Sequence, residues 1–289
     1  MGQDKRYSWF DVEWPTLLLI LTCYFAWFAA LWWLQLGFGI IAGGIAIALH
    51  SSLQHEVIHG HPFQSQWMSE LLIWPPLMLT VPYARFKATH LAHHHDEVIT
   101  DPYDDPESNY LDPSVWARLP RLLQTVLLVN NTVAGRLILG PLIGTIAFML
   151  CEWRTRDRHV IRDWVWHLPA AAAVLFLVWL SPMSIWAYLI ATYLGMSLLK
   201  LRTFLEHQAH DRASGRSVIV ERAGPVGLLF LNNNLHVVHH MHPRVAWYQL
   251  PALYRAHKPH YLRRNGGYFY NSYAEVIRRY LWSAKDSVA

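Results

Sequence analysis

The stretch from Trp14 to Leu36 (WPTLLLILTCYFAWFAALWWLQL) contains no charged residue over 23 positions. A helix of this length can cross the hydrocarbon core of a bilayer, which is about 30 Å thick. A core helix of a soluble protein would show a polar face, and this stretch shows none. It is too long for a signal-peptide core, and Asp4, Asp11 and Glu13 precede it. We therefore expect a retained membrane span.

The composition of the chain agrees with a membrane protein. Of its 289 residues, 53% are apolar and only 15% are charged, whereas soluble domains carry about 25% charged residues. No linker, repeat or low-complexity tract divides the chain, which favours a single domain over residues 1–289. Cys23 and Cys151 form no CxxC pair, so neither an iron–sulfur centre nor a disulfide framework is encoded. The net charge of +4 is modest and favours membrane topology over a nucleic-acid partner.

Two apolar hairpins are predicted. Gly37-Phe38-Gly39 allows a tight turn after the first span, and a second apolar run then continues to the motif HEVIH, which begins at His55. Trp164–Leu180 and Met183–Leu199 form a similar pair around Ser181-Pro182. We expect four membrane spans, at about residues 14–36, 38–58, 164–180 and 183–203.

The distribution of positive charge predicts the orientation. No Lys or Arg occurs between Arg6 and Arg85, or between Arg162 and Lys200. The positive-inside rule then makes both termini cytoplasmic. The expected fold class is an all-α integral membrane protein, with four transmembrane helices in two hairpins and a cytoplasmic helical cap over residues 84–162 and 204–289. A bacterial inner membrane is the expected setting.

Two further apolar stretches are interrupted. Trp67–Tyr83 contains Pro75-Pro76, and Leu122–Leu150 contains two asparagines, an arginine and a Gly-Pro pair. Re-entrant or interfacial elements suit both stretches better than spans.

Histidines are concentrated in a pattern that indicates a metal site. Fourteen of the 18 fall into four clusters. HEVIH places two of them four residues apart, and HLAHH and HVVHH place theirs at i, i+3 and i+4, on one face of a helix. A single histidine on an apolar face is usually a hydrogen-bonded structural residue, but two HxxHH boxes beside an HxxxH are not explained in that way. The clusters are His50, His55, His59 and His61; His90, His93, His94 and His95; His207 and His210; and His236, His239, His240 and His242.

HEVIH also fits the H-E-x-x-H pattern of zinc peptidases. Such a site needs two histidines, one further ligand and a catalytic glutamate, and it has no use for two HxxHH boxes. A zinc metalloprotease therefore stays a remote alternative, and Glu56 is expected to orient a neighbouring ligand through a hydrogen bond. A metal transporter or sensor is equally remote, because it predicts ligands within the spans, whereas these boxes lie at span ends.

HEVIH, HLAHH and NNNLHVVHHMHP resemble the three histidine boxes of the integral-membrane fatty acid desaturase and hydroxylase superfamily. The resemblance runs from about Leu49 to Pro251, and the hairpin topology agrees with it. FLEHQ (Phe204–Gln208) resembles the segment that supplies an extra histidine in membrane alkane hydroxylases. Carried over residue by residue, the resemblance implies a nine-histidine diiron centre. Its ligands would be His55, His59, His90, His93, His94, His207, His236, His239 and His240.

The other residues of these clusters have more than one interpretation. His61, His95, His210 and His242 are neighbours of the ligands or surface residues. His50 stays ambiguous, because His50 and His55 also form the first-box spacing of some acyl-CoA desaturases. The acidic run TDPYDDPES (Thr100–Ser108) is a source of acceptors for ligand N–H groups or an ordinary surface loop. Candidate acceptors are Asp96, Glu97, Asp101, Asp104, Asp105 and Glu206.

Histidine-rich ligation suits iron, and the resemblance implies that two iron ions use O2 as co-substrate to attack unactivated C–H bonds. Fatty acyl desaturation is the leading expectation. The alternative on the same site is a hydroxylase or monooxygenase reaction on a hydrocarbon, a carotenoid or a smaller molecule, including oxidative O-demethylation. A hydrophobic substrate taken from the lipid bilayer is expected in either case.

Each turnover needs two electrons from outside the chain. The sequence has no GxGxxG, no CxxC cluster and no haem-binding segment, which implies an external ferredoxin-type carrier with its reductase. A positive cytoplasmic surface would attract such an acidic partner; the same residues equally serve as the positive-inside signal or bind anionic lipid. These residues are Arg85, Lys87, Arg154, Arg156 and Arg158.

Overall fold

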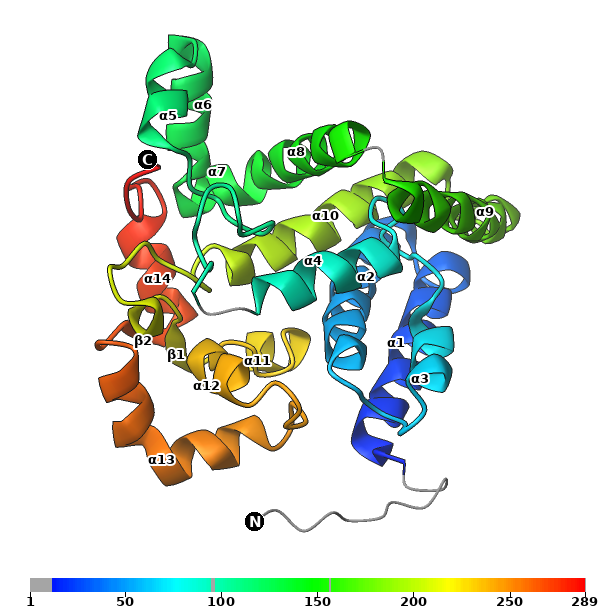
Figure 1. The fold of residues 1–289 in the computed structure, drawn as a ribbon. Helices are drawn as coiled ribbons and strands as arrows, with labels where there is room; N and C mark the ends of the chain where they lie inside the picture. Colours follow the sequence, from blue (N-terminus) through cyan, green and yellow to red (C-terminus); the bar gives the residue numbers. More distant parts are fainter. Residues whose placement is uncertain (1–11, 95–96, 156, 289) are drawn as a thin grey trace.

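The computed structural model describes residues 12–94, 97–155 and 157–288. Six residues named above lie outside these ranges: Asp4, Arg6, Asp11, His95, Asp96 and Arg156. Within the described ranges the chain is mostly helical (Figure 1).

The first predicted hairpin is formed by α1 (Trp14–Trp32) and α2 (Leu36–Ile58). Proline follows Trp14 in the first turn of α1, where its missing N–H leaves no hydrogen bond unmade. The two helices pack against each other along their length. The second half of α2 is buried as far as Ile58, so the HEVIH motif enters the interior of the molecule.

The second predicted hairpin is formed by α9 (Arg158–Leu180) and α10 (Ile185–Thr203). Three helices of the described residues, α1, α2 and α9, are long and apolar enough to cross a membrane. The fourth predicted span, α10, is present as a helix of 19 residues, but it is less apolar, because it contains Tyr188, Thr192 and Tyr193 and ends with Lys200 and Arg202. The four-span arrangement therefore stays a prediction.

Helices α2 and α10 cross at glycines. A Cβ atom added at Gly195 would lie 2.8 Å from the backbone oxygen of Gly44 and 3.0 Å from Ile47 Cγ2. Small residues allow such a close approach of helix backbones, as they do in membrane interfaces. The crossing brings the second hairpin directly onto the helix that carries HEVIH.

Both interrupted apolar stretches form short helices. The first holds α3 (Gln66–Ile73) and leads through Pro75-Pro76 into α4 (Tyr83–His93). The second is divided into α6 (Arg121–Asn130), α7 (Val133–Ile138) and α8 (Gly140–Thr155). These lengths agree with the prediction that neither stretch is a single span.

A small parallel sheet departs from the all-α expectation. β1 pairs with β2, with Ile219 opposite Phe269 and Val220 opposite Tyr270. β-branched and aromatic side chains favour strands, and the first two residues of each strand are of this kind. The sheet supports the third histidine box, because Val220 N donates to the Asn234 backbone oxygen at 2.8 Å.

The remaining elements are α5 (Pro113–Arg118), the 3-10 helix η1 (Ala213–Gly215), β1 (Ile219–Arg222), α11 (Pro225–Leu229), α12 (His236–Met241), α13 (Leu250–Arg264), β2 (Phe269–Ser272) and α14 (Tyr273–Tyr280).

Candidate metal centre

The nine histidines named as ligand candidates come together in two groups. Within each group, one ring nitrogen of every residue lies within 4.8 Å of the others. The five-histidine group consists of His55, His59, His90, His94 and His239. The four-histidine group consists of His93, His207, His236 and His240.

Helix periodicity explains this division. His90 on α4 and His94, which directly follows this helix, are four residues apart and turn to the five-histidine group, whereas His93 turns to the other group. On α12, His239 joins the five-histidine group, whereas His236 and His240 join the four-histidine group. Each of these two short helices therefore contributes to both groups. α2 completes the first group, and the loop after α10 completes the second.

The separations of the ring nitrogens match the donor set of a metal ion. In the four-histidine group, the Nε2–Nε2 distances are 2.8 Å for His93–His207, 2.9 Å for His207–His236 and 3.1 Å for His236–His240. Imidazole nitrogens bind a divalent metal such as zinc at about 2.0–2.1 Å, so two nitrogens on one ion lie roughly 2.9–3.4 Å apart. The same spacing recurs in the five-histidine group, at 2.9–3.2 Å for three pairs: His90–His94, His59–His90 and His94–His239.

Outer hydrogen bonds decide which nitrogens face inward without a proton. His93 Nδ1 donates to Asp105 Oδ1 at 2.8 Å, and His236 Nδ1 donates to Asn233 Oδ1 at 3.0 Å. A neutral imidazole that donates through Nδ1 keeps a bare lone pair on Nε2. His207 Nε2 lies 2.8 Å from His93 Nε2 and 2.9 Å from His236 Nε2, and one proton cannot lie in both contacts at once. The donor set therefore fits a shared cation.

The five-histidine group has the same character. His90 Nδ1 donates to Glu107 Oε1 at 3.2 Å. His55 Nε2 is buried and has no hydrogen-bond partner among the described residues. A buried nitrogen without a partner costs free energy unless something else binds it, so this group also fits a metal ion.

Burial keeps most of these rings neutral, as metal ligands must be. It lowers the pKa of His207, His236 and His239 well below the ordinary value. At His93 burial also lowers the pKa, but the Glu107 and Asp105 carboxylates outweigh it and raise the pKa to about 9. These two carboxylates favour a positive charge at His93, whether a proton or a metal ion supplies it.

Glu206 acts on the four-histidine group through an asparagine. It accepts from Asn233 Nδ2 at 2.7 Å, and Asn233 accepts in turn from His236. Arg202 Nε forms an ion pair with Glu206 at 2.9 Å. The asparagines before the third box thus fix the orientation of a ligand candidate.

Of the candidate acceptors, Asp105 accepts directly from a ligand candidate, and Glu206 reaches one through Asn233. Asp101 accepts the backbone N–H groups of Tyr103 and Asp104 and shapes its own loop. Glu107 belongs to the acidic run but is not among the candidate acceptors named above. Of several carboxylates in that run, no spacing rule shows which one folds back onto His90.

The structure gives Glu56 a different contact from the expected one. Its Oε1 accepts from Trp247 N at 2.8 Å and lies 3.7 Å from His61 Nε2. His61 Nδ1 in turn donates to Glu13 Oε1 at 2.7 Å. Glu56 therefore ties α2 to the loop after the third box, instead of orienting a ligand candidate.

Three further histidines of the four sequence clusters lie outside both groups. His50 Nε2 is 3.2 Å from Tyr24 OH within the first hairpin, which favours HEVIH as the first box. His210 Nδ1 accepts from the backbone N–H of Arg212 at 3.0 Å. His242 contacts the ring of Tyr261 edge-on.

Two of the five cationic side chains expected to attract a carrier form ion pairs with glutamates of this chain. Arg85 forms a two-pronged ion pair with Glu152, with Nε–Oε2 and Nη2–Oε1 distances of 2.9 Å. Lys87 Nζ donates to Glu70 Oε1 at 2.5 Å. Arg154 and Arg158 are exposed. The positive surface proposed from the sequence is thus smaller than expected.

Lys285, which is far from the histidine boxes in the sequence, contacts the segment that carries His207. Lys285 Nζ donates to the backbone oxygen of His207 at 2.5 Å, and its own backbone N–H donates to Asn131 O at 3.0 Å. Burial lowers the pKa of Lys285 to about 8. The residues after α14 therefore fasten the segment that carries His207, a contact that no sequence pattern indicated.

Comparisons with known proteins agree with the histidine boxes. The model of the fatty acid desaturase family matches residues 30–272, a range that contains both histidine groups. A beta-carotene ketolase of Paracoccus sp. (strain N81106 / MBIC 01143) is 28% identical over 232 residues, which cover 78% of this chain and 76% of the ketolase. A second beta-carotene ketolase, from Paracoccus sp. (strain PC1), is 26% identical over 232 residues, with 77% and 76% covered. Alkane 1-monooxygenase 2 of Alcanivorax borkumensis is 28% identical over 141 residues, which cover 42% of this chain and 35% of the monooxygenase.

Proposed function

The chain belongs to the fatty acid desaturase family, and from this premise we propose that it is a membrane-bound oxidase that uses two iron ions and O2 to attack C–H bonds of a hydrophobic substrate. The observation that carries the proposal is the division of nine imidazoles into groups of five and four. Each group holds enough nitrogens for one ion, and a single ion could not use all nine. The nine histidines are the proposed ligands.

Iron bound at the two groups would supply the reduction of O2 and the abstraction of hydrogen from carbon. The chain's own residues prepare the donors. Asp105, Glu107 and Asn233 hold the Nδ1 protons of His93, His90 and His236, so that each Nε2 is directed inward. Such outer hydrogen bonds fix ring orientation and strengthen a ligand's basicity.

We favour oxygen insertion as the reaction. The two relatives that match over about three quarters of this chain are both named beta-carotene ketolases, and a ketone carries a new oxygen atom. One insertion consumes O2, two electrons and two protons, and it yields an alcohol and water. A second insertion at the same carbon gives a geminal diol, which loses water to form a ketone. A carotenoid or a similarly long apolar molecule is the proposed substrate class.

Fatty acyl desaturation is the second candidate, and the family match supports it. It consumes the same O2, two electrons and two protons, but it removes two hydrogens from the substrate and releases two waters. Both reactions need an external electron carrier with its reductase, of ferredoxin type in our proposal.

The proposed topology follows from the charge pattern and the hairpins. A Cβ atom added at Gly39, next to the first turn, would lie 3.1 Å from Met183 Cε, next to the second turn. The two hairpin turns therefore lie at the same end of the helices. Four spans, a single domain, and both termini and the metal centre on the cytoplasmic side are consistent with this placement.

The experiment that tests the function uses purified protein in lipid nanodiscs, with iron, a ferredoxin and its reductase, and ¹⁸O2. The substrates are a carotenoid and a fatty acyl lipid, presented separately. Mass spectrometry of the products should show ¹⁸O in an oxidised carotenoid. An unlabelled alkene from the acyl lipid would transfer the assignment to desaturation, and stoichiometric zinc in natively isolated protein would refute the iron assignment.

A further inference from the structure

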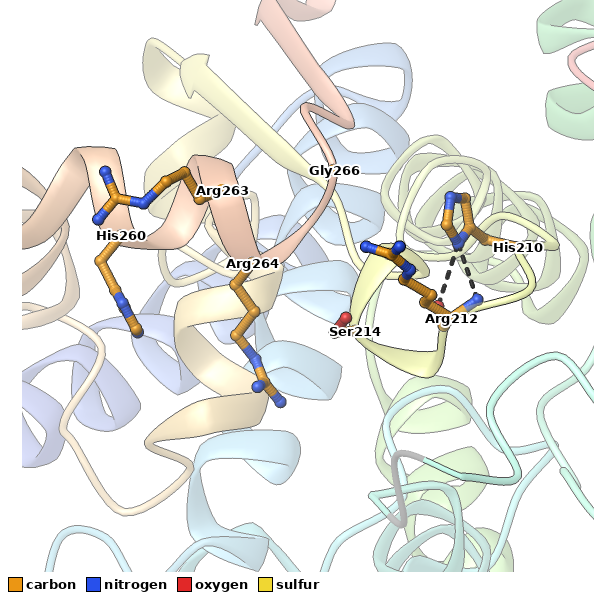
Figure 2. Close-up of a pocket in the computed structure, with 8 residues that line it drawn as sticks. His210, Arg212, Ser214, His260, Arg263, Arg264 and Gly266 are labelled. Carbon is orange, nitrogen blue, oxygen red and sulfur yellow. Dashed lines mark hydrogen bonds between the residues drawn. The ribbon is translucent and has the colours of Figure 1, made fainter.

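A positively charged pocket lies beside the four-histidine group, on the surface of the molecule. Its volume is about 630 Å³. One wall is the loop around η1, and the other is the end of α13 and the turn that follows it (Figure 2). The side chains that matter here are His210, Arg212 and Ser214 on the first wall and His260, Arg263 and Arg264 on the second.

The described lining of this pocket carries charge of one sign. Three arginines and two histidines line it, and none of the lining residues among those that the structure describes is acidic. Arg263 and Arg264 also lie in the last turn of α13, where cations favour the helix dipole. That explanation does not extend to Arg212, which comes from a different segment and faces the same space. A concave surface of one charge sign attracts a partner of the opposite sign.

The loop wall is bonded to the neighbours of His207. Gln208 N donates to Arg216 O at 3.0 Å, and Gln208 Nε2 donates to Gly215 O at 3.0 Å. Ser217 Oγ lies 3.3 Å from His207 Nδ1. A molecule held in the pocket would therefore be separated from the four-histidine group by one short, hydrogen-bonded strip of chain.

We propose that this pocket is the docking site for the electron carrier, and that the carrier presents an acidic surface to it. The inference rests on the proposed function. Per oxygen insertion, two reduced iron–sulfur carriers would each give up one electron here and leave oxidised. Of the cations proposed from the sequence, Arg85 and Lys87 are already paired with Glu152 and Glu70.

The position of the pocket favours a protein over a lipid headgroup. Figure 1 shows α13 and the two strands at the side of the molecule opposite α9 and the turn into α10. The elements that line the pocket thus lie at the end of the molecule away from the hairpin turns, on the side expected to be cytoplasmic.

The test measures binding first. The full chain, loaded with iron in nanodiscs of neutral lipid, is titrated with an acidic plant-type [2Fe–2S] ferredoxin at low salt. Arg212→Glu/Arg263→Glu changes two exposed arginines of the pocket, and Arg154→Glu/Arg158→Glu changes two exposed arginines elsewhere by the same total charge. We expect the pocket variant to raise the Kd roughly tenfold and the control to change it less than about twofold, with the difference lost near 0.5 M salt. Arg212→Gln/Arg263→Gln, a milder pair, should raise the Kd about threefold and serves if the reversal variant does not fold.

Iron content, and reoxidation by O2 after chemical reduction with dithionite, should be unchanged in the pocket variant, because neither uses the carrier. A Kd that rises only in the control variant, or wild-type protein that does not bind ferredoxin, would overturn the docking site. An effect present only in nanodiscs of anionic lipid would assign the pocket to a lipid headgroup. Since binding needs no turnover, protein that docks ferredoxin through the pocket but oxidises no substrate would refute the proposed function alone.

Discussion

His207 has the most demanding position of the nine candidate ligands. Its Nε2 lies 2.8 Å from His93 Nε2 and 2.9 Å from His236 Nε2, and it comes from a loop after α10 that belongs to no histidine box. Without it, the four-histidine group keeps residues from α4 and α12 only. His210, three residues later, is exposed and turned to the backbone of Arg212.

His207→Ala should therefore lower the iron content from about two ions per chain to about one or fewer, and reduce turnover by about 100-fold or more, since a lost ligand exceeds the 10–100-fold typical of outer contacts. His210→Ala is the matched control and should keep its iron. Both variants are measured by metal analysis at equal expression. Iron retained in the first and lost in the second would remove His207 from the ligand set.

Asp105 is the acceptor for His93 and also receives the backbone N–H groups of Thr100 and Glu107. Asp105→Ala should weaken iron binding or activity about 10–100-fold. Asp105→Asn should recover most of this loss, because an amide oxygen can still accept from His93. Asp104→Ala, which changes the exposed neighbour, is the control in a chelator competition assay. Equal losses in all three variants would show that the loop, and not the hydrogen bond, is what iron binding requires.

At this scale the sequence predicted donors better than acceptors. The i, i+3 and i+4 spacing of HLAHH and HVVHH restricts where the histidines can point, so all nine meet. The partners of their outer nitrogens depend on how loops fold. Glu107 reaches His90 across 17 residues, and Lys285 reaches His207 across 78 residues. Neither distance follows from a local pattern.

Among the elements, the contact between α2 and α10 decides whether the first and second hairpins meet at the metal centre. α2 ends at the first histidine box, and α10 leads directly to His207. Their close crossing depends on Gly44 and Gly195, whose backbones approach more closely than any side chain would allow.

Gly195→Ala should destabilise the protein by about 1–3 kcal/mol, because its Cβ would meet a backbone oxygen that cannot move aside. The melting temperature in detergent and the iron content should both fall. Gly37→Ala is the control, since a Cβ there would meet no atom within 4 Å. An unchanged melting temperature in Gly195→Ala would mean that the helices are not as close as described.

The elements were predicted unevenly for physical reasons. Uncharged runs showed where α1, α2 and α9 lie. Pro75-Pro76 and Asn130-Asn131 showed where the interrupted stretches break. The two strands were missed, because four-residue strands leave too short a pattern and their pairing joins residues about 50 positions apart. The positive surface was overestimated, because Glu152 neutralises Arg85 from 67 residues away.

For the whole molecule, the two hairpin turns lie together at the end away from the histidine groups. If the chain crosses the membrane four times, both turns must be on the side opposite the metal centre. By the positive-inside rule, the side with the two turns is the non-cytoplasmic side of the membrane.

Single cysteines at Gly37 and Ser181 should therefore react with an impermeant maleimide in intact cells, whereas one at Ser283, after α14, should react only after lysis. The background is Cys151→Ser, because Cys151 is exposed and Cys23 is buried. Labelling of Ser181→Cys only after lysis would contradict the two-hairpin topology, because the second turn would then share a side with the histidine boxes.

The sharing of α12 by both histidine groups has a consequence for biogenesis. Each group includes at least one histidine from His236–Met241, and protein chains are synthesised from the N-terminus onward. All four predicted spans precede α12, so the membrane segments are translated and inserted while neither group is complete. If the two groups bind iron as proposed, insertion into the bilayer comes first, and metal loading follows as a separate, later event. Cells starved of iron should accumulate this protein already embedded in the membrane and ready to be activated when iron returns.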